Sequence, residues 1–412
     1  MIQQNVDVAV IGAGPAGLAA AVSARKNGAK RVLILDRNNW RGGILPQCIH
    51  DGFGVEETGK SMTGPEYANM YVKMAEKQKI EFMLETMVLD LNKKLEITAV
   101  NKNGLHKIKA KSIVLAMGCR EKTRWSIMIP GDRPSGIFTA GVAQTFINLY
   151  NILPGKNIVL LGSGDVGLIM ARRLKFEGAN VQGVVEILPF PSGLPRNVVQ
   201  CLDDFDIPIY LNHTVTRIEG RQRLKSVTIA QVDENKDIIP GSERKIKCDT
   251  LLLSLGLIPE NELPKNIGIN LDEKTGGPII NQLYETNIPG VFACGNCLQV
   301  YDTVDALSKG ASLAGKNAVK KIEKKEKEIE VRPGKNVRYV LPQKITQSGL
   351  VHFTLRVTKP DQSVNLKIKA DKKEIFKKKQ RWVNPANMME LDFELSDELF
   401  KSAKTMEVFL DE

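Results

Sequence analysis

The sequence predicts an α/β protein with two three-layer α/β/α domains and a small antiparallel β domain at its carboxyl end. Three observations lead to this prediction. A strand, a glycine turn and a helix follow one another near the amino terminus; the same pattern returns in the middle of the chain; and residues 333–412 alternate between apolar and polar side chains. The 412 residues suffice for two or three domains, each with its own core.

The two copies of the glycine pattern match closely. Val8-Ala-Val-Ile-Gly-Ala-Gly-Pro-Ala-Gly17 recurs as Ile158-Val-Leu-Leu-Gly-Ser-Gly-Asp-Val-Gly167. In each copy a helical segment follows, and a second apolar strand then ends in an acid, Asp36 or Glu186, at the same distance from the first glycine. This combination is typical of Rossmann-like dinucleotide-binding units.

Each glycine of the pattern has its own physical reason. The first permits a tight turn, the second lets a diphosphate approach the backbone, and the third lets the helix pack closely on the strand. The free N–H groups and positive dipole end of the helix favour phosphates, and the acid accepts a hydrogen bond from a ribose hydroxyl. A lone copy could be a simple turn between packed elements, but two copies in the same context predict two dinucleotide sites. The glycines are Gly12, Gly14 and Gly17, then Gly162, Gly164 and Gly167.

Composition favours a soluble globular enzyme of the cytoplasm. Charged residues make up 25% of the chain, and no stretch approaches the roughly 20 apolar residues of a membrane span. Six scattered cysteines form no dense disulfide framework, which suits a reducing compartment. The net charge of +11 is spread along the chain without interleaved aromatic residues, so it indicates anionic cofactors or acidic partners rather than nucleic acid.

The first half has features beyond its glycine pattern. Arg41-Gly42-Gly43 follows soon after Asp36, and glycines there would let the chain pass closely against a long dinucleotide. Two further apolar strands, Ser112 to Gly118 and Ile288 to Asn296, end in small-residue turns, and a helix rich in small residues begins near Thr303. The two dinucleotide sites are therefore not equivalent.

This order of motifs resembles the two-dinucleotide flavoproteins of the pyridine nucleotide-disulfide oxidoreductase superfamily over about residues 5–325. The resemblance implies FAD in the first site and NAD in the second. It implies an FAD-binding domain of residues 1–122 and 255–325, an NAD(P)H-binding domain of residues 123–254 with a hinge at Gly256-Leu-Ile-Pro259, and a C-terminal β domain of residues 333–412. The expected cofactor-binding residues are Gly12, Gly14, Pro15, Ala16, Gly17, Asp36, Arg37, Arg41, Gly42, Gly43, Val88, Ala116, Gly118, Gly295 and Asn296 in the first site, and Gly162, Gly164, Asp165, Gly167 and Glu186 in the second.

The chain departs from the superfamily pattern in two places. Asn296 stands where the superfamily usually has an aspartate, but an amide can still hydrogen-bond a hydroxyl, so we expect FAD binding to persist. The paired cysteines of disulfide reductases are missing, because Cys48 stands alone after Gly43, so conventional disulfide reduction is not expected. In the second site Glu186 suits a free 2'-hydroxyl, which favours NAD over NADP, although Arg196 nearby would soften that preference.

A more specific likeness lies in the loop Gly42 to Gly54. It resembles a bacterial subgroup associated with glycerol 3-phosphate dehydrogenase, in which an NAD-linked flavoprotein works beside a second flavoprotein and a small cysteine-bearing protein. Pro134 to Gln144 likewise resembles that subgroup and the related alpha subunits of amino-acid dehydrogenases. The likeness implies such redox partners and is compatible with a homo- or hetero-oligomer.

The same loop supplies the catalytic candidates Gln47, Cys48 and His50, which are expected near the flavin ring for hydrogen bonding or proton transfer. Alternatively, Cys48 is a small buried hydrophobic residue and His50 holds the loop through a backbone hydrogen bond. Cys294-Gly-Asn-Cys297 is expected mainly to cradle the flavin, and a redox pair is the less favoured alternative. No further ligands accompany it at zinc spacing, so no metal site is expected.

The last part of the chain changes in composition. A Lys- and Glu-rich run, Lys316 to Glu330, is expected to end a helix and form a linker. The alternating segments Val351 to Val357, Val364 to Lys369 and Met389 to Leu395 predict strands. The resulting β domain has no cysteine, and it is either a docking surface for a partner or a cap with a solvated basic face.

Three functions remain open from the sequence. In the first, an FAD enzyme passes electrons between NAD(H) and a partner redox protein or small acceptor, as in a glycerol 3-phosphate dehydrogenase system. In the second, the flavin directly oxidises a small-molecule substrate, glycerol 3-phosphate or an amino acid, with Arg120 and Arg124 as the candidate clamp. In the third, the chain is a non-catalytic assembly subunit that retains FAD as structure.

Overall fold

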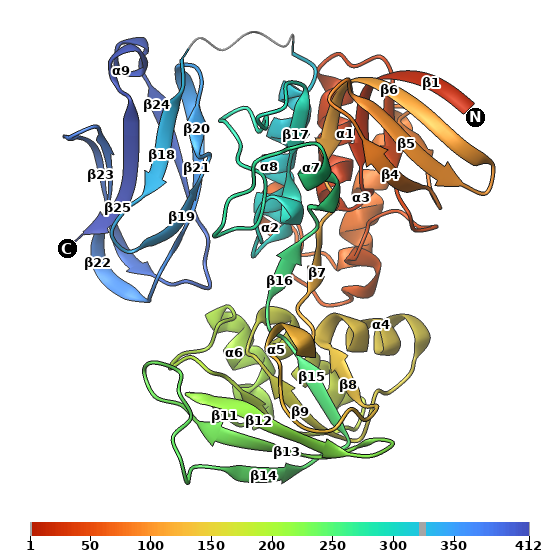
Figure 1. The fold of residues 1–412 in the computed structure, drawn as a ribbon, viewed down its shortest axis with the longest axis vertical. Helices are drawn as coiled ribbons and strands as arrows, with labels where there is room; N and C mark the ends of the chain where they lie inside the picture. Colours follow the sequence, from red (N-terminus) through yellow and green to blue (C-terminus); the bar gives the residue numbers. More distant parts are fainter. Residues whose placement is uncertain (1, 321–326, 412) are drawn as a thin grey trace. The chain divides into compact units, whose positions relative to one another are not determined.

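The computed structural model describes residues 2–320 and 327–411. These residues form two compact units, one of residues 1–119 with 259–412 and one of residues 120–258. The chain leaves the first unit through β7 (Cys119–Glu121) and returns through β16 (Leu257–Pro259), and these two strands pair (Figure 1). Part of the predicted linker, residues 321–326, and with it the expected domain end at residue 325, lies outside the described residues. The division into three domains stays a prediction.

The first unit is built on a seven-stranded mixed sheet with the order β3-β2-β1-β6-β5-β4, and with β17 also paired to β6. The strands around the first glycine pattern are parallel. The segments nearest the turn, 8–11, 32–35 and 113–115, are apolar and buried, as expected for strands that are covered on both faces. They are β1 (Ile2–Ile11), β2 (Val32–Leu35), β3 (Glu81–Met83), β6 (Gly104–Leu115) and β17 (Val291–Ala293). The hairpin of β4 (Met87–Leu91) and β5 (Glu96–Asn101) completes the sheet in antiparallel pairing.

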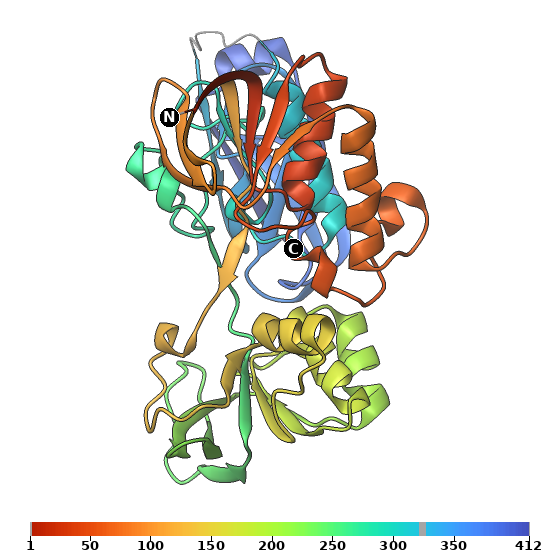
Figure 2. The ribbon, with the colours of Figure 1, turned by 90° about the vertical axis from the view of Figure 1, so that its right-hand side faces the viewer.

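Helices α1 (Pro15–Lys26), α3 (Gly64–Lys77) and α8 (Val304–Asn317) pack against one another beside this sheet (Figure 2). Their small residues allow a close approach: a Cβ at Gly315 would lie 2.0 Å from the Ala20 carbonyl oxygen. The short elements η1 (Leu45–Gln47), α2 (Val55–Thr58), α7 (Glu262–Asn266) and η4 (Gly295–Cys297) lie in the connections. Because the strands around the first glycine pattern run parallel, their carboxyl ends lie at one edge of the sheet. Open α/β sheets bind ligands at this edge.

The second unit repeats the plan with a five-stranded parallel sheet, order β11-β10-β9-β15-β8. Its strands are β8 (Ile137–Thr139), β9 (Asn157–Leu161), β10 (Asn180–Val185), β11 (Ile209–Tyr210) and β15 (Thr250–Leu253). Helices α4 (Ala140–Tyr150), α5 (Asp165–Phe176) and α6 (Pro195–Cys201) accompany it. An antiparallel meander of β12 (His213–Gly220), β13 (Leu224–Gln231) and β14 (Arg244–Lys247) follows β11.

The apolar run 246–255 does not form one strand, because it is divided between β14 and β15. Asp249 stands at the division, where its carboxylate accepts hydrogen bonds from the backbone N–H groups of Lys156 and Asn157. This anchor directs β15 into the parallel sheet beside β9.

The C-terminal residues form two sheets around a core of their own, of which Phe353 and Val408 are fully buried members. The strands are β18 (Ile329–Pro333), β19 (Val337–Leu341), β20 (Lys344–Ile345), β21 (Gly349–Val357), β22 (Asp361–Ala370), β23 (Lys373–Val383), β24 (Met389–Leu395) and β25 (Thr405–Asp411), with α9 (Asp397–Ser402) before the last. All three expected strand segments lie within strands. The pairing is not wholly antiparallel as predicted, because β18 and β25 run parallel.

Candidate functional site

The first glycine turn lies where β1 ends and α1 begins. Gly12 has φ of +112°, and a Cβ there would lie 2.3 Å from the carbonyl oxygen of Ala116 at the end of β6. A Cβ at Gly17 would lie 1.8 Å from the carbonyl oxygen of Gly12. Both positions therefore admit only glycine, and they bring the amino terminus of α1 to the carboxyl edge of the sheet.

Two distant segments pack on the same turn. The N–H of Gly42 donates to the carbonyl oxygen of Ala13 at 2.8 Å, and a Cβ at Gly43 would lie 2.8 Å from the Cα of Gly14. A Cβ at Gly295 would lie 2.5 Å from the Cβ of Ala16. The structure thus gathers the Arg41-Gly42-Gly43 segment and the turn after β17 around the start of α1, as the sequence predicted for one ligand. Near Gly14 a Cβ would meet only Gly43, at 3.9 Å, which leaves room for a diphosphate at the amino terminus of α1.

Asp36 follows β2 at the same edge. Its Oδ2 accepts the N–H of Ala13 at 2.7 Å and its Oδ1 accepts the N–H of Asn38 at 2.8 Å. The carboxylate is half-buried and retains acceptor capacity for a ribose hydroxyl. Arg37 beside it is exposed, and Val88 is buried on β4 opposite Ala99.

Arg41 makes protein contacts of its own. Its guanidinium lies 4.4 Å from the ring centroid of Phe82 and pairs with the carboxylate of Glu76 on α3. These contacts hold the 38–43 loop against α3 and β3. A contact between Arg41 and a phosphate of the cofactor remains a prediction.

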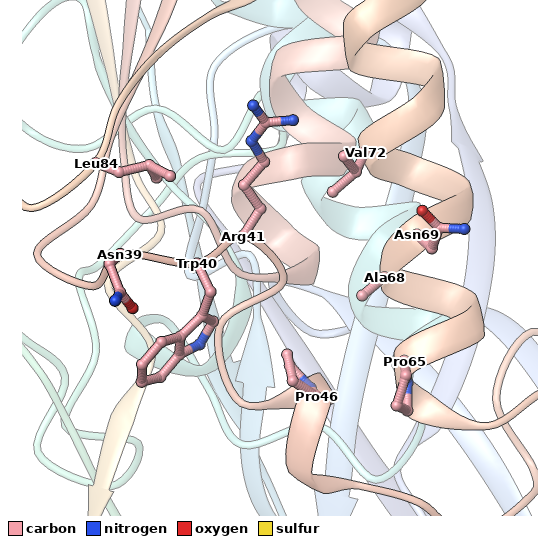
Figure 3. A pocket seen from close by; sticks show the side chains of 9 residues that line it. All are labelled: Asn39, Trp40, Arg41, Pro46, Pro65, Ala68, Asn69, Val72 and Leu84. Atoms are coloured by element: carbon pink, nitrogen blue, oxygen red, sulfur yellow. The ribbon is translucent and has the colours of Figure 1, made fainter. Parts of the chain in front are cut away.

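A cavity of about 420 Å³ lies between this loop and α3 (Figure 3). Trp40 and Pro46 form one wall, and the Nε1–H of Trp40 donates to the carbonyl oxygen of Gly43 at 2.9 Å. The volume is within the range of small-molecule sites. The remaining lining residues are Asn39, Arg41, Pro65, Ala68, Asn69, Val72 and Leu84.

The second glycine turn repeats the backbone plan of the first. Gly162 has φ of +95°, and a Cβ there would lie 2.1 Å from the carbonyl oxygen of Ser254 after β15. A Cβ at Gly167 would lie 2.7 Å from the Cβ of Ser254. The N–H of Ser163 donates to Glu186 Oε2 at 2.9 Å, as that of Ala13 does to Asp36 in the first turn. The residues of this turn therefore fit a second dinucleotide.

The acid of the second turn is more enclosed than Asp36. Glu186 is only 3% exposed and also accepts hydrogen bonds from the Leu188 N–H at 3.0 Å and the Ser192 hydroxyl at 3.2 Å. The first helical residue is Asp165, whose Oδ1 accepts the N–H of Leu194 at 2.8 Å and the amide of Asn197 at 2.6 Å. Hydrogen bonds to the carboxylates of Glu186 and Asp165 therefore hold segment 188–197 beside the second turn.

The catalytic candidates lie on and after η1. Burial raises the pKa of the Cys48 thiol to about 12, and its Sγ lies 3.5 Å from the carbonyl oxygen of Ile44. His50 Nδ1 lies 3.0 Å from the carbonyl oxygen of Asp51, and its ring packs 5.0 Å from that of Phe53. Gln47 is half-buried. These contacts favour the structural alternative for Cys48, because its thiol stays protonated near neutral pH.

Cys294 and Cys297 are both fully buried. None of the six cysteines, all of which lie in the described residues, forms a disulfide. Burial raises the pKa of Cys297 to about 11 and also raises the pKa of Cys294. The Cys297 thiol donates to the Leu115 carbonyl at 3.3 Å. Between them, Asn296 accepts the N–H of Tyr301 at its Oδ1, at 3.1 Å, which leaves its NH₂ group to donate. The pair packs as core, and Asn296 keeps the donor that a flavin side-chain hydroxyl requires.

A network of hydrogen bonds around α2, which we call the polar clasp, was not predicted from the sequence. Asp305, in the first turn of α8, accepts the backbone N–H groups of Gly54, Glu56 and Glu57 at 3.0–3.1 Å. The Glu57 carboxylate in turn accepts the hydroxyls of Tyr67 and Tyr71 at 2.6 and 2.7 Å. Burial, then Glu57, raises the pKa of the Tyr71 phenol. The clasp fixes the far end of the Gln47 to His50 loop, and an acid opening a small-residue helix was its one sequence signal.

Comparison with known proteins decides the family. Residues 6–311 match the family model described as pyridine nucleotide-disulphide oxidoreductase. The chain belongs to this family. Its membership confirms the predicted oxidoreductase class and the predicted cofactors, FAD with NAD(P)H.

Individual relatives are distant. The chain is 26% identical over 305 residues to human apoptosis-inducing factor 3, covering 71% of this chain and 46% of that protein, so it spans about half of that relative's length. It is 22% identical over 302 residues to a ferredoxin–NADP reductase of Picrophilus torridus, covering 72% of this chain and 87% of that protein. A thioredoxin reductase from T. acidophilum aligns with a TM-score of 0.62 and 24% identity, over 76% of this chain and 98% of that one, which shows a shared fold.

Within the part of the chain that the structure describes, none of the helices combines the length and the apolar character that a bilayer span requires. Within the same residues, no group of three or more His, Cys, Asp or Glu side chains is arranged to hold a metal ion.

Proposed function

We propose that this protein passes electrons between NAD(H) and a partner redox protein or small acceptor through a bound FAD. The observation that supports this most is the duplicated turn: one acid and three glycines in each unit, with the same amide-to-acid hydrogen bond. The first turn alone gathers two further glycine segments, as a long dinucleotide requires. The flavin supplies hydride and electron chemistry when bound, and the protein supplies position and electrostatics.

In this proposal the FAD diphosphate lies at the amino terminus of α1, where no acid occupies the first turn. Asp36 accepts a ribose hydroxyl, and the free NH₂ of Asn296 donates to the ribityl chain. Gly43 and Gly295 keep side chains away from the same path. The loop of Gln47, Cys48 and His50 lies by the ring, with Gln47 and His50 as its remaining polar candidates.

NADH is the proposed nicotinamide cofactor. Glu186 is a buried acceptor at the position that contacts the adenosine ribose, and a 2'-phosphate would bring negative charge against it. Arg196, on α6, is exposed and opposes this preference only weakly.

The acceptor is proposed to be a second flavoprotein or a small cysteine-bearing redox protein. Ferredoxin–NADP reductase, by its name, is a relative that serves a separate redox protein. Cys48 forms no disulfide, and Cys294 and Cys297 are buried as thiols in the core, so the proposal uses no disulfide of this chain as a relay. The proposal of a glycerol 3-phosphate dehydrogenase system rests only on the likeness of two sequence segments, Gly42 to Gly54 and Pro134 to Gln144.

Direct oxidation of glycerol 3-phosphate or an amino acid at this flavin has less support. Arg124, one candidate clamp, donates to the backbone carbonyls of Ile129, Gly131 and Asp132 at 2.6–3.3 Å. Its guanidinium is therefore engaged in holding its own loop.

Anaerobic mixing with NADH tests the proposal. We expect the flavin absorbance to bleach with NADH, more slowly with NADPH, and not with glycerol 3-phosphate. Absence of bleaching by either nucleotide, in protein whose flavin still photoreduces, would refute it and favour the assembly subunit.

A further inference from the structure

The outer edge of the C-terminal β region carries a dense group of positive charges. Strand β23 is the last strand of the sheet β20-β18-β25-β22-β23, so only one of its sides is paired. Six exposed cations lie on it and on the turn before it, and we call them the basic strip: Lys372, Lys373, Lys377, Lys378, Lys379 and Arg381. The positive charge of the chain is therefore more concentrated on this sheet edge than its spread along the sequence suggested.

The acidic side chains nearest to the strip in sequence bind groups outside the strip. Asp371 accepts the backbone N–H groups of Lys404 and Thr405, which lowers its pKa. Glu374 pairs with Lys367 on β22 at 3.4 Å. Among the residues that the structure describes, no carboxylate lies within ion-pair distance of the strip. Its charge is consequently available to an outside partner.

Protection of a free sheet edge explains only part of this charge. Lysine on an edge strand discourages pairing with other chains, and Lys378, opposite the buried Leu366, suits that purpose. Lys377, Lys379 and Arg381 alternate onto the other face. Lys377 lies directly opposite Lys367, whose charge is offset by Glu374 and Asp411, while no carboxylate of the described residues pairs with Lys377 itself. Uncompensated charge beyond what edge protection needs indicates a binding role.

The strip lies away from the attachment of the β region to the rest of its unit. That attachment uses the other sheet, where Arg356 on β21 pairs with Asp302 at 2.6 Å. It also uses β20, at the opposite edge of the sheet that holds the strip, where the Lys344 N–H donates to the Ile280 carbonyl oxygen at 3.2 Å. At the end of the strip, Trp382 is 44% exposed. An exposed tryptophan beside arginine is the residue combination that dominates many protein interfaces.

We propose that the basic strip, with Trp382 at its end, docks an acidic face of the redox protein with which this enzyme exchanges electrons. The identity of the partner as a redox protein rests on the proposed function. A protein fits better than nucleic acid, because a single aromatic side chain gives no stacking platform for successive bases. The strip steers and anchors the partner through charge, so association is faster at low ionic strength.

The test compares two triple variants of the full-length holoprotein. K377Q/K378Q/K379Q removes charge from the strip, and K93Q/K94Q/K274Q removes the same charge from exposed lysines elsewhere in the unit. The probe is an oxidised plant-type [2Fe–2S] ferredoxin, an acidic protein, and its association is measured by biolayer interferometry at rising NaCl. Cytochrome c, a basic protein, and a labelled DNA duplex are measured alongside.

We expect ferredoxin to associate with the wild type and the control at similar rates that fall with salt, and about tenfold more slowly with the strip variant. Trp382→Ala should speed dissociation at every salt concentration. Any one of four results would overturn the proposal. These are equal ferredoxin binding by both triple variants, no ferredoxin binding by the wild type, tighter binding of cytochrome c than of ferredoxin, and a strip variant that loses only DNA binding. Bleaching by NADH is measured on the same samples: if it fails while strip-dependent binding holds, the proposed function falls and the docking surface stands.

Discussion

The two glycine turns share a backbone plan and differ in what stands at the start of the helix. Helix α1 opens with Pro15 and has no acid in its first turn, whereas α5 opens with Asp165. Asp36 keeps acceptor capacity at a half-exposed carboxylate, whereas Glu186 is buried under Ser192. A diphosphate at α1 meets only the positive dipole end, while one at α5 also meets a carboxylate. Under the proposed function, this difference accounts for a resident cofactor in one unit and an exchangeable one in the other.

The largest expected effect is on the first turn. Gly43→Ala places a Cβ 2.8 Å from the Cα of Gly14 at φ of +59°, so we expect FAD content to fall tenfold or more, measured as flavin absorbance per protein. Gly59→Ala is the matched control, since its φ is +71° and nothing lies within 4 Å of the new Cβ. Equal FAD loss in both variants would mean that backbone strain, not closure of the cradle, decides binding.

A smaller effect is expected at the acid of the second turn. Glu186→Gln puts a donor where four donors already point, so the KM for NADH should rise about tenfold, which is about 1.4 kcal/mol. The KM for NADPH should change less, because a repulsive charge is lost at the same time. Ser192→Ala removes one contact to the carboxylate and serves as the mild comparison. An unchanged NADH to NADPH ratio would contradict the assignment of Glu186.

A change in the opposite direction is expected at Asp165. Asp165→Asn keeps an oxygen for the Leu194 N–H and removes the negative charge, so NADH should bind two- to fivefold more tightly, about 0.5–1 kcal/mol. Fluorescence titration of the oxidised protein with NADH measures this, with FAD content unchanged. Weaker binding would show that the carboxylate supports the site rather than opposing a diphosphate.

The smallest effect is expected at Cys48. Cys48→Ser should leave the rate of flavin bleaching within about twofold, because a thiol of pKa about 12 is protonated at neutral pH. The raised pKa also gives a direction for stability. The thiol of the unfolded chain ionises near pH 8.5, below the folded value, so this group destabilises the fold as the pH rises above about 9. Thermal melts of wild type and Cys48→Ser at pH 7 and pH 10 should diverge only at the higher pH.

The sequence predicted most where the signal was local and repeated. Both strand–turn–helix units and their acids follow from spacing within about forty residues, and the structure has them in place. Parallel pairing of β18 with β25 joins distant segments, and alternation within a strand carries no information about its partner. Asp305 likewise acts on a loop some 250 residues earlier. The basic strip was overlooked because charge was considered along the chain rather than on one sheet edge.

We propose that one turn holds a flavin and that the other delivers reducing equivalents from NADH. Anaerobic stopped-flow mixing with NADH distinguishes the two roles when the wild type is compared with Gly167→Val, in which a Cβ would lie 2.7 Å from the Cβ of Ser254. We expect the wild-type flavin to bleach, and the variant to retain its FAD, to photoreduce normally and not to be reduced by NADH. Equal bleaching of both proteins by NADH would contradict it.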